Sequence, residues 1–264
     1  MTMVSHEGPS TSLRKFEGVL KIVRFNIQFY AMSLIGFVLV LGILASHLLP
    51  LWLARLVFFG AFVMAFWTIS SLLVSWYVYD FAGVTRWAWM PTQLQRVPRK
   101  WVNIHAGLDE STAALKMMFP DSEGAVIDIY DSAEMTEPSI ARARRMYPAT
   151  EPFTTGTFDH LPLPGMDRDE VFLLFAAHEV RTPEHRTQLL SETSRILKHG
   201  GQVILVEHLR DWPNFLAFGP GFLHFHSERS WRKNIQEAGL QVDRESTITP
   251  FVRCFFLRKA EQWS

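Results

Sequence analysis

Histidine and glutamate side chains that can exchange protons near neutral pH occur at three places in the second half of the chain. They are His178 with Glu179, Glu207 with His208, and His224 with His226. An imidazole has an ordinary pKa of about 6.5, so His178 suits the role of a general base, with Glu179 or His208 orienting it. The candidate catalytic residues are His178, Glu179, His208 and His224. For each of them, the alternative is a structural hydrogen bond at the end of a strand.

Clusters of histidine and carboxylate side chains also bind divalent ions. The sequence shows no paired ligand spacing around these residues, so we predict no metal site. The single cysteine, Cys254, excludes an internal disulfide and any paired-cysteine metal site. Because Cys254 lies in an apolar stretch, we expect a small core residue.

The elements that position these groups alternate between strand and helix patterns from residue 101 onwards, which indicates an α/β protein with a doubly wound, mostly parallel sheet. We expect strands at 101–105, 125–130, 154–157, 171–176 and 202–206, helices at 112–118, 137–146, 184–197 and 227–238, and a final antiparallel pair at 241–246 and 251–257. Ligands of such sheets bind beyond the carboxyl ends of the strands. The histidines and glutamates after the fourth and fifth strands should therefore converge at one edge.

The run from Glu192 to Glu207 combines a basic helix end, a turn with two glycines and a hydrophobic strand. Lys198 and His199 would end the helix, where cations are favoured, and Gly200 can adopt the left-handed conformation that follows a helix. In its order, this run resembles the segment before strand five of class I S-adenosylmethionine-dependent methyltransferases, with His199 where that family usually has proline. The resemblance covers residues 101–259. It implies a seven-stranded, Rossmann-like methyltransferase fold with S-adenosyl-L-methionine as the cofactor.

The resemblance implies cofactor contacts after the first and second strands. His105 and Gly107 stand where the family usually has a three-glycine loop, and only Gly107 is retained. An acid after the second strand accepts hydrogen bonds from the ribose hydroxyls in the family. We favour Asp131 for this role because Asp128 falls inside the expected strand, although either can serve. The alternative for Asp131 is that it caps the next turn.

Three further residues complete the implied cofactor site. Thr157 replaces the usual acid at the adenine edge, where it can still donate a hydrogen bond, and Phe158 can pack on adenine. Tyr79 occupies the stretch where many family members cover the cofactor with a tyrosine. All three assignments follow from the resemblance.

Two stretches, 29–49 and 56–78, contain no Asp, Glu, Lys or Arg, and each is long enough to cross a hydrocarbon core of roughly 30 Å. They predict a transmembrane helical hairpin; the alternative is a pair of buried core helices. Arg55 is the only basic residue between them, whereas several precede and follow the hairpin: Arg14, Lys15, Lys21, Arg24, Arg86, Arg96, Arg99 and Lys100. This distribution predicts a multi-pass inner-membrane protein with both ends in the cytoplasm.

The predicted organisation is a cytoplasmic N-terminal segment at 1–28, the hairpin at 29–78, a juxtamembrane linker at 79–100 and a methyltransferase-like domain at 101–264. The 26 basic and 26 acidic residues balance, so we expect no nucleic-acid partner. Oligomeric state does not follow from the sequence.

An aromatic and aliphatic segment before the last helix predicts a lid over a hydrophobic acceptor, or residues that cover the sheet or rest on the bilayer: Trp212, Phe215, Leu216, Phe218, Phe222, Leu223, Phe225 and Trp231. The predicted function is a membrane-anchored methyltransferase that acts on a quinone, a long-chain phenol or another lipid, in contact with membrane lipid. The weakened glycine loop keeps two alternatives open. One is a related enzyme that transfers an amino group to a quinone, and the other is a membrane scaffold without catalysis.

Overall fold

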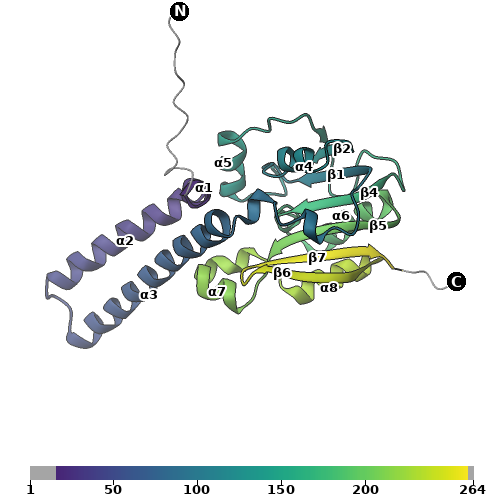
Figure 1. Cartoon of the computed structure of the whole chain (residues 1–264). Helices are drawn as coiled ribbons and strands as arrows, with labels where there is room; N and C mark the ends of the chain where they lie inside the picture. Colours follow the sequence, from purple (N-terminus) through teal and green to yellow (C-terminus); the bar gives the residue numbers. More distant parts are fainter. Residues whose placement is uncertain (1–15, 261–264) are drawn as a thin grey trace, which may run out of the picture. The chain divides into compact units, whose positions relative to one another are not determined.

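The computed structural model describes residues 16–260, which form two compact units (Figure 1). One unit extends to Gly83 and also includes Leu216–Gly219. The other contains Val84–Phe215 and the chain from Pro220 onwards. Arg14, Lys15 and the rest of the expected N-terminal segment before residue 16 lie outside the described residues.

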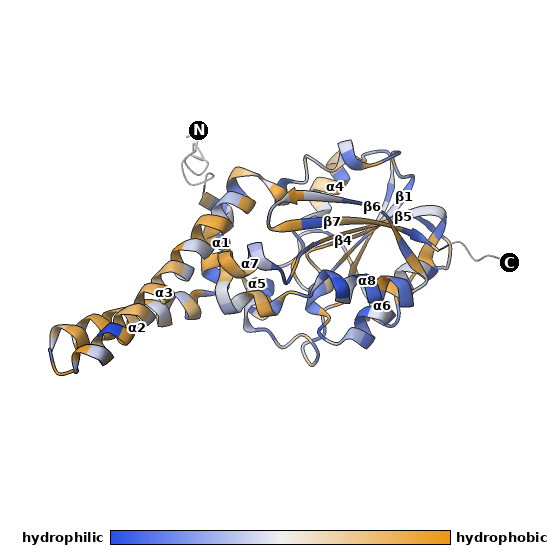
Figure 2. Cartoon of the chain, turned by 90° about the horizontal axis from the view of Figure 1, so that it is seen from below, coloured by the Kyte–Doolittle hydropathy of each residue, from blue (hydrophilic) through white to orange (hydrophobic). Residues whose placement is uncertain are grey.

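The first unit is helical. It consists of α1 (Glu17–Phe25), α2 (Ile27–Ala45), α3 (Leu51–Ser75) and the π-helix η2 (Trp76–Phe81). Both α2 and α3 are long and apolar enough to cross a membrane, and Figure 2 shows them hydrophobic along almost their whole length. The expected spans began at residues 29 and 56, whereas α3 starts directly after Pro50, which lacks the N–H that a helix start leaves unpaired.

Hydroxyl groups join α2 to α3 inside this apolar pair. Ser33 Oγ lies 2.8 Å from Thr68 Oγ1, and the Tyr30 hydroxyl lies 3.3 Å from Ser71 Oγ. Thr68 and Ser71 also donate to backbone carbonyls of α3. These polar side chains are therefore satisfied between the helices, as a non-aqueous environment requires.

The buried carboxylate of Asp80 in η2 caps the start of α1. It accepts hydrogen bonds from the backbone N–H groups of Gly18 and Val19 at 2.7 and 2.8 Å. A helix N-terminus leaves such N–H groups unpaired and favours negative charge. Gly18 is required by space, because a Cβ there would lie 2.5 Å from the Cβ of Tyr79.

The second unit contains a seven-stranded sheet in the order β3-β2-β1-β4-β5-β7-β6. Its strands are β1 (Lys100–His105), β2 (Glu123–Asp128), β3 (Thr154–Thr155), β4 (Arg168–Leu174), β5 (Leu197–His208), β6 (Leu240–Thr249) and β7 (Val252–Lys259). β7 runs antiparallel to β5 and β6, and the other pairings are parallel. The predicted α/β class, strand count and final antiparallel pair are confirmed.

Helices cover both faces of this sheet. They are α4 (Thr112–Met118), α5 (Pro138–Met146), α6 (Pro183–Ile196) and α8 (Glu228–Glu237), with short 3₁₀ turns η3 (Val84–Arg86), η4 (Pro91–Gln93) and η5 (Ala177–Glu179). After β5 come α7 (Trp212–Phe218) and the turn η6 (Gly219–His224), which include the Leu216–Gly219 segment of the first unit. Figure 2 shows α6 and α8 on one side of the sheet and α4 on the other. Right-handed crossovers produce this arrangement, since strand order advances in opposite directions after β1 and after β4.

The core lies between the sheet and its helices. Val203, Leu205 and Phe255 are fully buried in it, and so is Trp231 of α8, which we had expected in a lid. Cys254 in β7 is buried, as predicted, and burial raises the pKa of its thiol to about 12.

The boundary between α6 and β5 differs from the prediction. α6 ends at Ile196, and Leu197 already pairs with Arg168 of β4, so Lys198 and His199 belong to a strand. Gly200 does adopt a positive φ of 71°, but it does so within β5, after an irregularity in the pairing with β4. Pairing with a neighbouring strand decided this boundary over the local helix-end pattern.

Candidate functional site

Five parallel strands end at one edge of the sheet, at His105 (β1), Asp128 (β2), Thr155 (β3), Leu174 (β4) and His208 (β5). The order of strands reverses between β1 and β4, and in open α/β sheets ligands bind beyond the carboxyl ends at this switch point. The predicted site residues of the second unit lie around this edge or on the segments that leave it.

The loop after β1 is tied to the end of β2. Gly107 has a φ of 91°, and its N–H donates to Asp128 Oδ1 at 3.0 Å. Tyr130 N–H donates to the same oxygen at 3.0 Å, and Arg144 of α5 forms an ion pair with Oδ2. The Arg144 guanidinium also lies over the Tyr130 ring, 4.8 Å from its centre. Asp128 thus fixes the shape of this loop from the last residue of β2, and not from inside a longer strand as expected.

The imidazole of His105 is 3% exposed, and neither ring nitrogen has a hydrogen-bond partner among the described residues. Its Nδ1 lies 3.6 Å from Asp128 Oδ1. Burial lowers the pKa of His105, so the ring is neutral at pH 7. Buried polar atoms without partners at a ligand-binding edge fit a polar ligand such as a nucleoside, which can satisfy them.

Asp131 lies on the exposed turn after β2. Its Oδ1 accepts a hydrogen bond from Ala133 N–H at 2.8 Å, which is the turn-capping arrangement that we had considered as the alternative. Thr157 donates to Asp159 at 2.6 Å, and Phe158 stacks on His185 with ring centres 4.2 Å apart. Tyr79 belongs to η2 in the helical unit.

The strongest cluster of titratable groups follows β4 and β5. Glu207, which is completely buried in β5, accepts hydrogen bonds from both the backbone N–H and Nδ1–H of His178, at 3.1 and 2.7 Å. The other ring nitrogen of His178, Nε2, faces Glu179 Oε1 at 3.4 Å. The turn η5 holds His178 and Glu179 next to each other, so that one imidazole lies between two carboxylates.

In this cluster, burial and the neighbouring charges shift the pKa values of His178 and Glu179 in opposite directions. Burial alone would lower the pKa of His178, but the charge of Glu207 and the hydrogen bonds to both carboxylates raise the pKa to about 10. For Glu179, burial raises the pKa, but the interaction with His178 outweighs burial and lowers it. At neutral pH, His178 is therefore an imidazolium and Glu179 a carboxylate.

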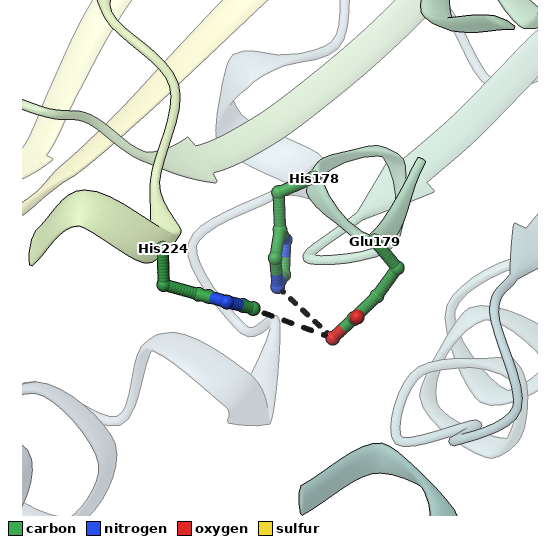
Figure 3. Close-up of side chains that lie close together, drawn as sticks. All are labelled: His178, Glu179 and His224. Carbon is green, nitrogen blue, oxygen red and sulfur yellow. Dashed lines mark ion pairs between the residues drawn. The ribbon is translucent and has the colours of Figure 1, made fainter. Parts of the chain in front are cut away.

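His224 approaches the same carboxylate from η6 (Figure 3). Its Nε2 lies 4.0 Å from Glu179 Oε1, and its Nδ1 lies 3.5 Å from Glu137 Oε1. Burial, followed by the charge of His178, lowers the pKa of His224 to about 3, so this ring is neutral. Arg181 donates to the backbone carbonyls of both histidines, at 3.1 Å for His178 and 2.7 Å for His224.

The structure brings together His178, Glu179 and His224 but separates His208 from them. His208 stacks between Phe175 and Phe225, and its Nδ1–H donates to the carbonyl of Phe251. Burial lowers the pKa of His208 to about 4. Successive residues of a strand point to opposite faces, so Glu207 and His208 cannot both face the cluster.

Sequence reasoning missed two residues of the site. Glu137, which faces His224, and Arg144, which pairs with Asp128, come from the start and the body of α5. Neither has a local sequence signal, since charged residues are common on exposed helix positions.

Comparison with known proteins agrees with this fold. A family model described as a methyltransferase domain matches residues 111–205. No curated protein matches the sequence. The PH0226 protein from Pyrococcus horikoshii OT3 is similar in structure, with a TM-score of 0.50 and 14% identity over 69% of this chain and 91% of that chain. Human N-acetylserotonin methyltransferase in complex with SAM has a TM-score of 0.49 and 17% identity, covering 79% of this chain and 56% of that one.

The sheet order and the helices on both faces define a Rossmann-like methyltransferase fold. The match to a methyltransferase domain lies within this fold, between the start of α4 and β5.

Proposed function

We propose that this chain is an S-adenosylmethionine-dependent methyltransferase, anchored in the inner membrane by the α2–α3 hairpin, with its α/β unit in the cytoplasm. Its acceptor is a lipophilic small molecule such as a quinone, a long-chain phenol or another lipid. The observation that carries the proposal is the group His178, Glu179 and Glu207 at the carboxyl ends of β4 and β5, where this fold binds its ligands.

The cofactor site in this proposal lies at the ends of β1 and β2. Bound S-adenosylmethionine supplies a methyl group on a sulfonium ion. Gly107 lets the backbone approach the ligand, because it carries no Cβ and adopts a positive φ. Asp131 accepts hydrogen bonds from the ribose hydroxyls, while Asp128 holds the loop. The remaining predicted contacts of the α/β unit are His105, Thr157 and Phe158.

In this proposal, the cluster after β4 removes the proton from the acceptor. Because the pKa of His178 is raised to about 10, this residue already carries its proton at neutral pH. The carboxylate of Glu179 is then the proton acceptor, and His178 is the positively charged group that orients it and compensates its charge. Glu207 holds the imidazole through Nδ1. This division revises our expectation that His178 itself is the base.

A lipophilic acceptor is supported by the apolar residues of the chain. Two helices of the first unit pass the length and composition criteria for a membrane span. In the second unit, Trp212 is 74% exposed and Leu223 is 55% exposed. Single exposed apolar residues are common, but large aromatic ones near a ligand-binding edge favour an apolar partner.

The test uses the full-length protein in detergent micelles with S-adenosylmethionine that carries an isotopic label in its methyl group. Lipid extract from cells lacking the gene provides the acceptor. We expect label in one lipid, which becomes heavier by one methylene group. In Glu179→Gln, we expect turnover to fall by about 10²- to 10⁴-fold with cofactor affinity unchanged.

Two other outcomes have defined meanings. A product that gains nitrogen, but not the labelled carbon, would show that the enzyme transfers an amino group and not a methyl group. Absence of cofactor binding in calorimetry would contradict an enzymatic function and favour a membrane scaffold.

A further inference from the structure

The side chains of His178, Glu179 and His224 point toward one another and together resemble the ligand set of a metal ion. One ligand atom from each residue lies within 4.8 Å of the others (Figure 3). We propose that these three residues bind one divalent transition-metal ion. Two imidazoles and one carboxylate match the known preference of Zn²⁺ and of neighbouring first-row ions.

Both imidazoles are oriented as metal ligands are. His178 Nδ1 faces the Glu207 carboxylate at 2.7 Å, and His224 Nδ1 faces the Glu137 carboxylate at 3.5 Å. These outer contacts leave both Nε2 atoms directed at Glu179 Oε1. In metal sites, a carboxylate behind the histidine fixes the ring and the tautomer in this manner. Arg181 also lies 3.5 Å from His224 Nδ1, but its NH1 is already bonded to the His224 carbonyl at 2.7 Å.

The Glu179 carboxylate provides an independent observation. The residue is 6% exposed, and its Oε2 has no hydrogen-bond partner within residues 16–260. A buried carboxylate oxygen without a partner is costly, and a cation satisfies it directly. Glu137, Glu179 and Glu207 all face the two imidazoles, so a divalent cation would meet a negatively charged set of ligands and neighbours.

The distances suit coordination after a small adjustment. Two ligands of a tetrahedral ion with bonds of about 2.1 Å lie roughly 3.4 Å apart. His178 Nε2 and Glu179 Oε1 are already 3.4 Å apart. His224 lies 4.0 Å from the same oxygen, and its side chain is 25% exposed, so this ring has room to move inwards.

The role of the ion rests on the proposed function, whereas its binding does not. Three protein ligands leave a coordination position open for the acceptor's oxygen. A divalent cation lowers the pKa of a hydroxyl that coordinates it, so the bound acceptor would release its proton to water. The ion would take the place of the proton on His178 Nε2, and Glu179 would then be a ligand and not the base.

The experiment is calorimetry of Zn²⁺ binding to the full-length protein in micelles, purified without a polyhistidine tag and treated with EDTA before dialysis. We expect one ion per chain with a micromolar or tighter dissociation constant. With Co²⁺ in place of Zn²⁺, we expect a visible absorption band from the nitrogen ligands. His224→Ala and Glu179→Gln should each weaken binding at least about tenfold. Glu207→Gln should weaken it about 10- to 100-fold, because Glu207 holds the His178 ring through Nδ1.

His199→Ala is the matched control, because His199 is exposed in β5 and its loss should leave Zn²⁺ affinity unchanged. Thermal unfolding of each variant identifies any that fail to fold, and the partly exposed His224 makes His224→Ala the safest variant. Absence of stoichiometric binding, or binding that folded His224→Ala and Glu179→Gln retain at parent affinity, would overturn the inference. S-adenosylmethionine binding is measured separately, so a chain that binds the cofactor but not Zn²⁺ disproves the metal site and leaves the proposed function intact.

Discussion

At the scale of single residues, the two aspartates at the end of β2 have different surroundings. Asp128 is buried, and both of its oxygens are engaged by Gly107, Tyr130 and Arg144. Asp131 is exposed, and its carboxylate accepts a hydrogen bond from Ala133 N–H within a turn. A carboxylate on an exposed turn remains accessible to a ligand, which supports our proposal that Asp131 makes the ribose contact.

Asp131→Ala should weaken the affinity for S-adenosylmethionine by about 10- to 100-fold, because hydrogen bonds to a charged acceptor contribute about 1.5 to 3 kcal/mol. Calorimetry with the purified protein measures this change. Asp131→Asn is the matched variant, since an amide oxygen still caps the turn but carries no charge, and we expect an intermediate loss. Parent affinity in Asp131→Ala would transfer the role to Asp128.

Gly107→Ala should lower both stability and cofactor affinity. A φ of 91° costs a residue with a Cβ about 1 to 2 kcal/mol, and the added carbon would lie 3.0 Å from the Tyr130 ring. Thermal unfolding and calorimetry measure the two effects. Gly200→Ala is the control: its φ is 71° but nothing lies within 4 Å, so stability should fall while cofactor affinity stays. Equal cofactor affinity in Gly107→Ala and the parent would contradict a ligand at this loop.

The sequence predicted part of the acid–base cluster for a physical reason. His178, Glu179 and Glu207 follow neighbouring parallel strands, whose carboxyl ends share an edge. The prediction also groups His208 with these residues, but His208 points to the opposite face of β5 from Glu207. Glu137 was not predictable, because it reaches His224 through the tertiary fold alone.

At the scale of elements, periodicity and turn residues located the seven strands and four of the helices, but not α7, which forms in the segment that we predict as a lid. The other errors concern the ends of elements. β2 ends at Asp128, before Tyr130, and β5 begins at Leu197, before Gln202. Both errors arise where pairing with a neighbouring strand, which the local sequence does not encode, decides the boundary.

Glu170 in β4 should make the stability of the folded protein depend on pH. This side chain is 2% exposed, and burial raises its pKa from 4.5 to about 8. Arg96 and Arg258 oppose that shift, and Asp169 adds to it. The folded protein thus holds a proton that the unfolded chain releases above pH 4.5, so stability falls as pH rises from about 4.5 to 8.

Glu170→Gln should remove this dependence, because an amide of similar shape does not titrate. At about 1.4 kcal/mol per pKa unit, the parent should lose a few kcal/mol relative to the variant between pH 5 and 8. Thermal unfolding of both proteins across this range measures the difference. Parallel curves of melting temperature against pH would show that Glu170 titrates normally.

At the scale of the whole molecule, the proposed hairpin predicts on which side of the membrane each part of the chain lies. Cysteine substitutions can report this because the native Cys254 is buried and gives little background. Leu48→Cys, in the turn after α2, should react with a membrane-impermeant maleimide on intact spheroplasts. Met117→Cys, in α4, should react only after the membrane is opened. Leu48 and Met117 are 84% and 77% exposed, so both thiols are accessible. Labelling of both from one side would exclude a spanning hairpin.

The hydroxyl pairs between α2 and α3 also predict which positions of the hairpin tolerate substitution. Residues that form these pairs should tolerate few changes, whereas outward-facing residues should tolerate many. Phe29, Met32 and Phe58 are more than 60% exposed, and in the proposed membrane hairpin such positions require only an apolar side chain. Such positions should drift among Leu, Ile, Val, Phe and Met from one related sequence to the next. Ser33 and Thr68 fix the register of the two helices, so they should vary only among small hydroxylated residues. A saturation library of the hairpin, selected for membrane insertion and activity, would distinguish the positions that tolerate many substitutions from those that tolerate few.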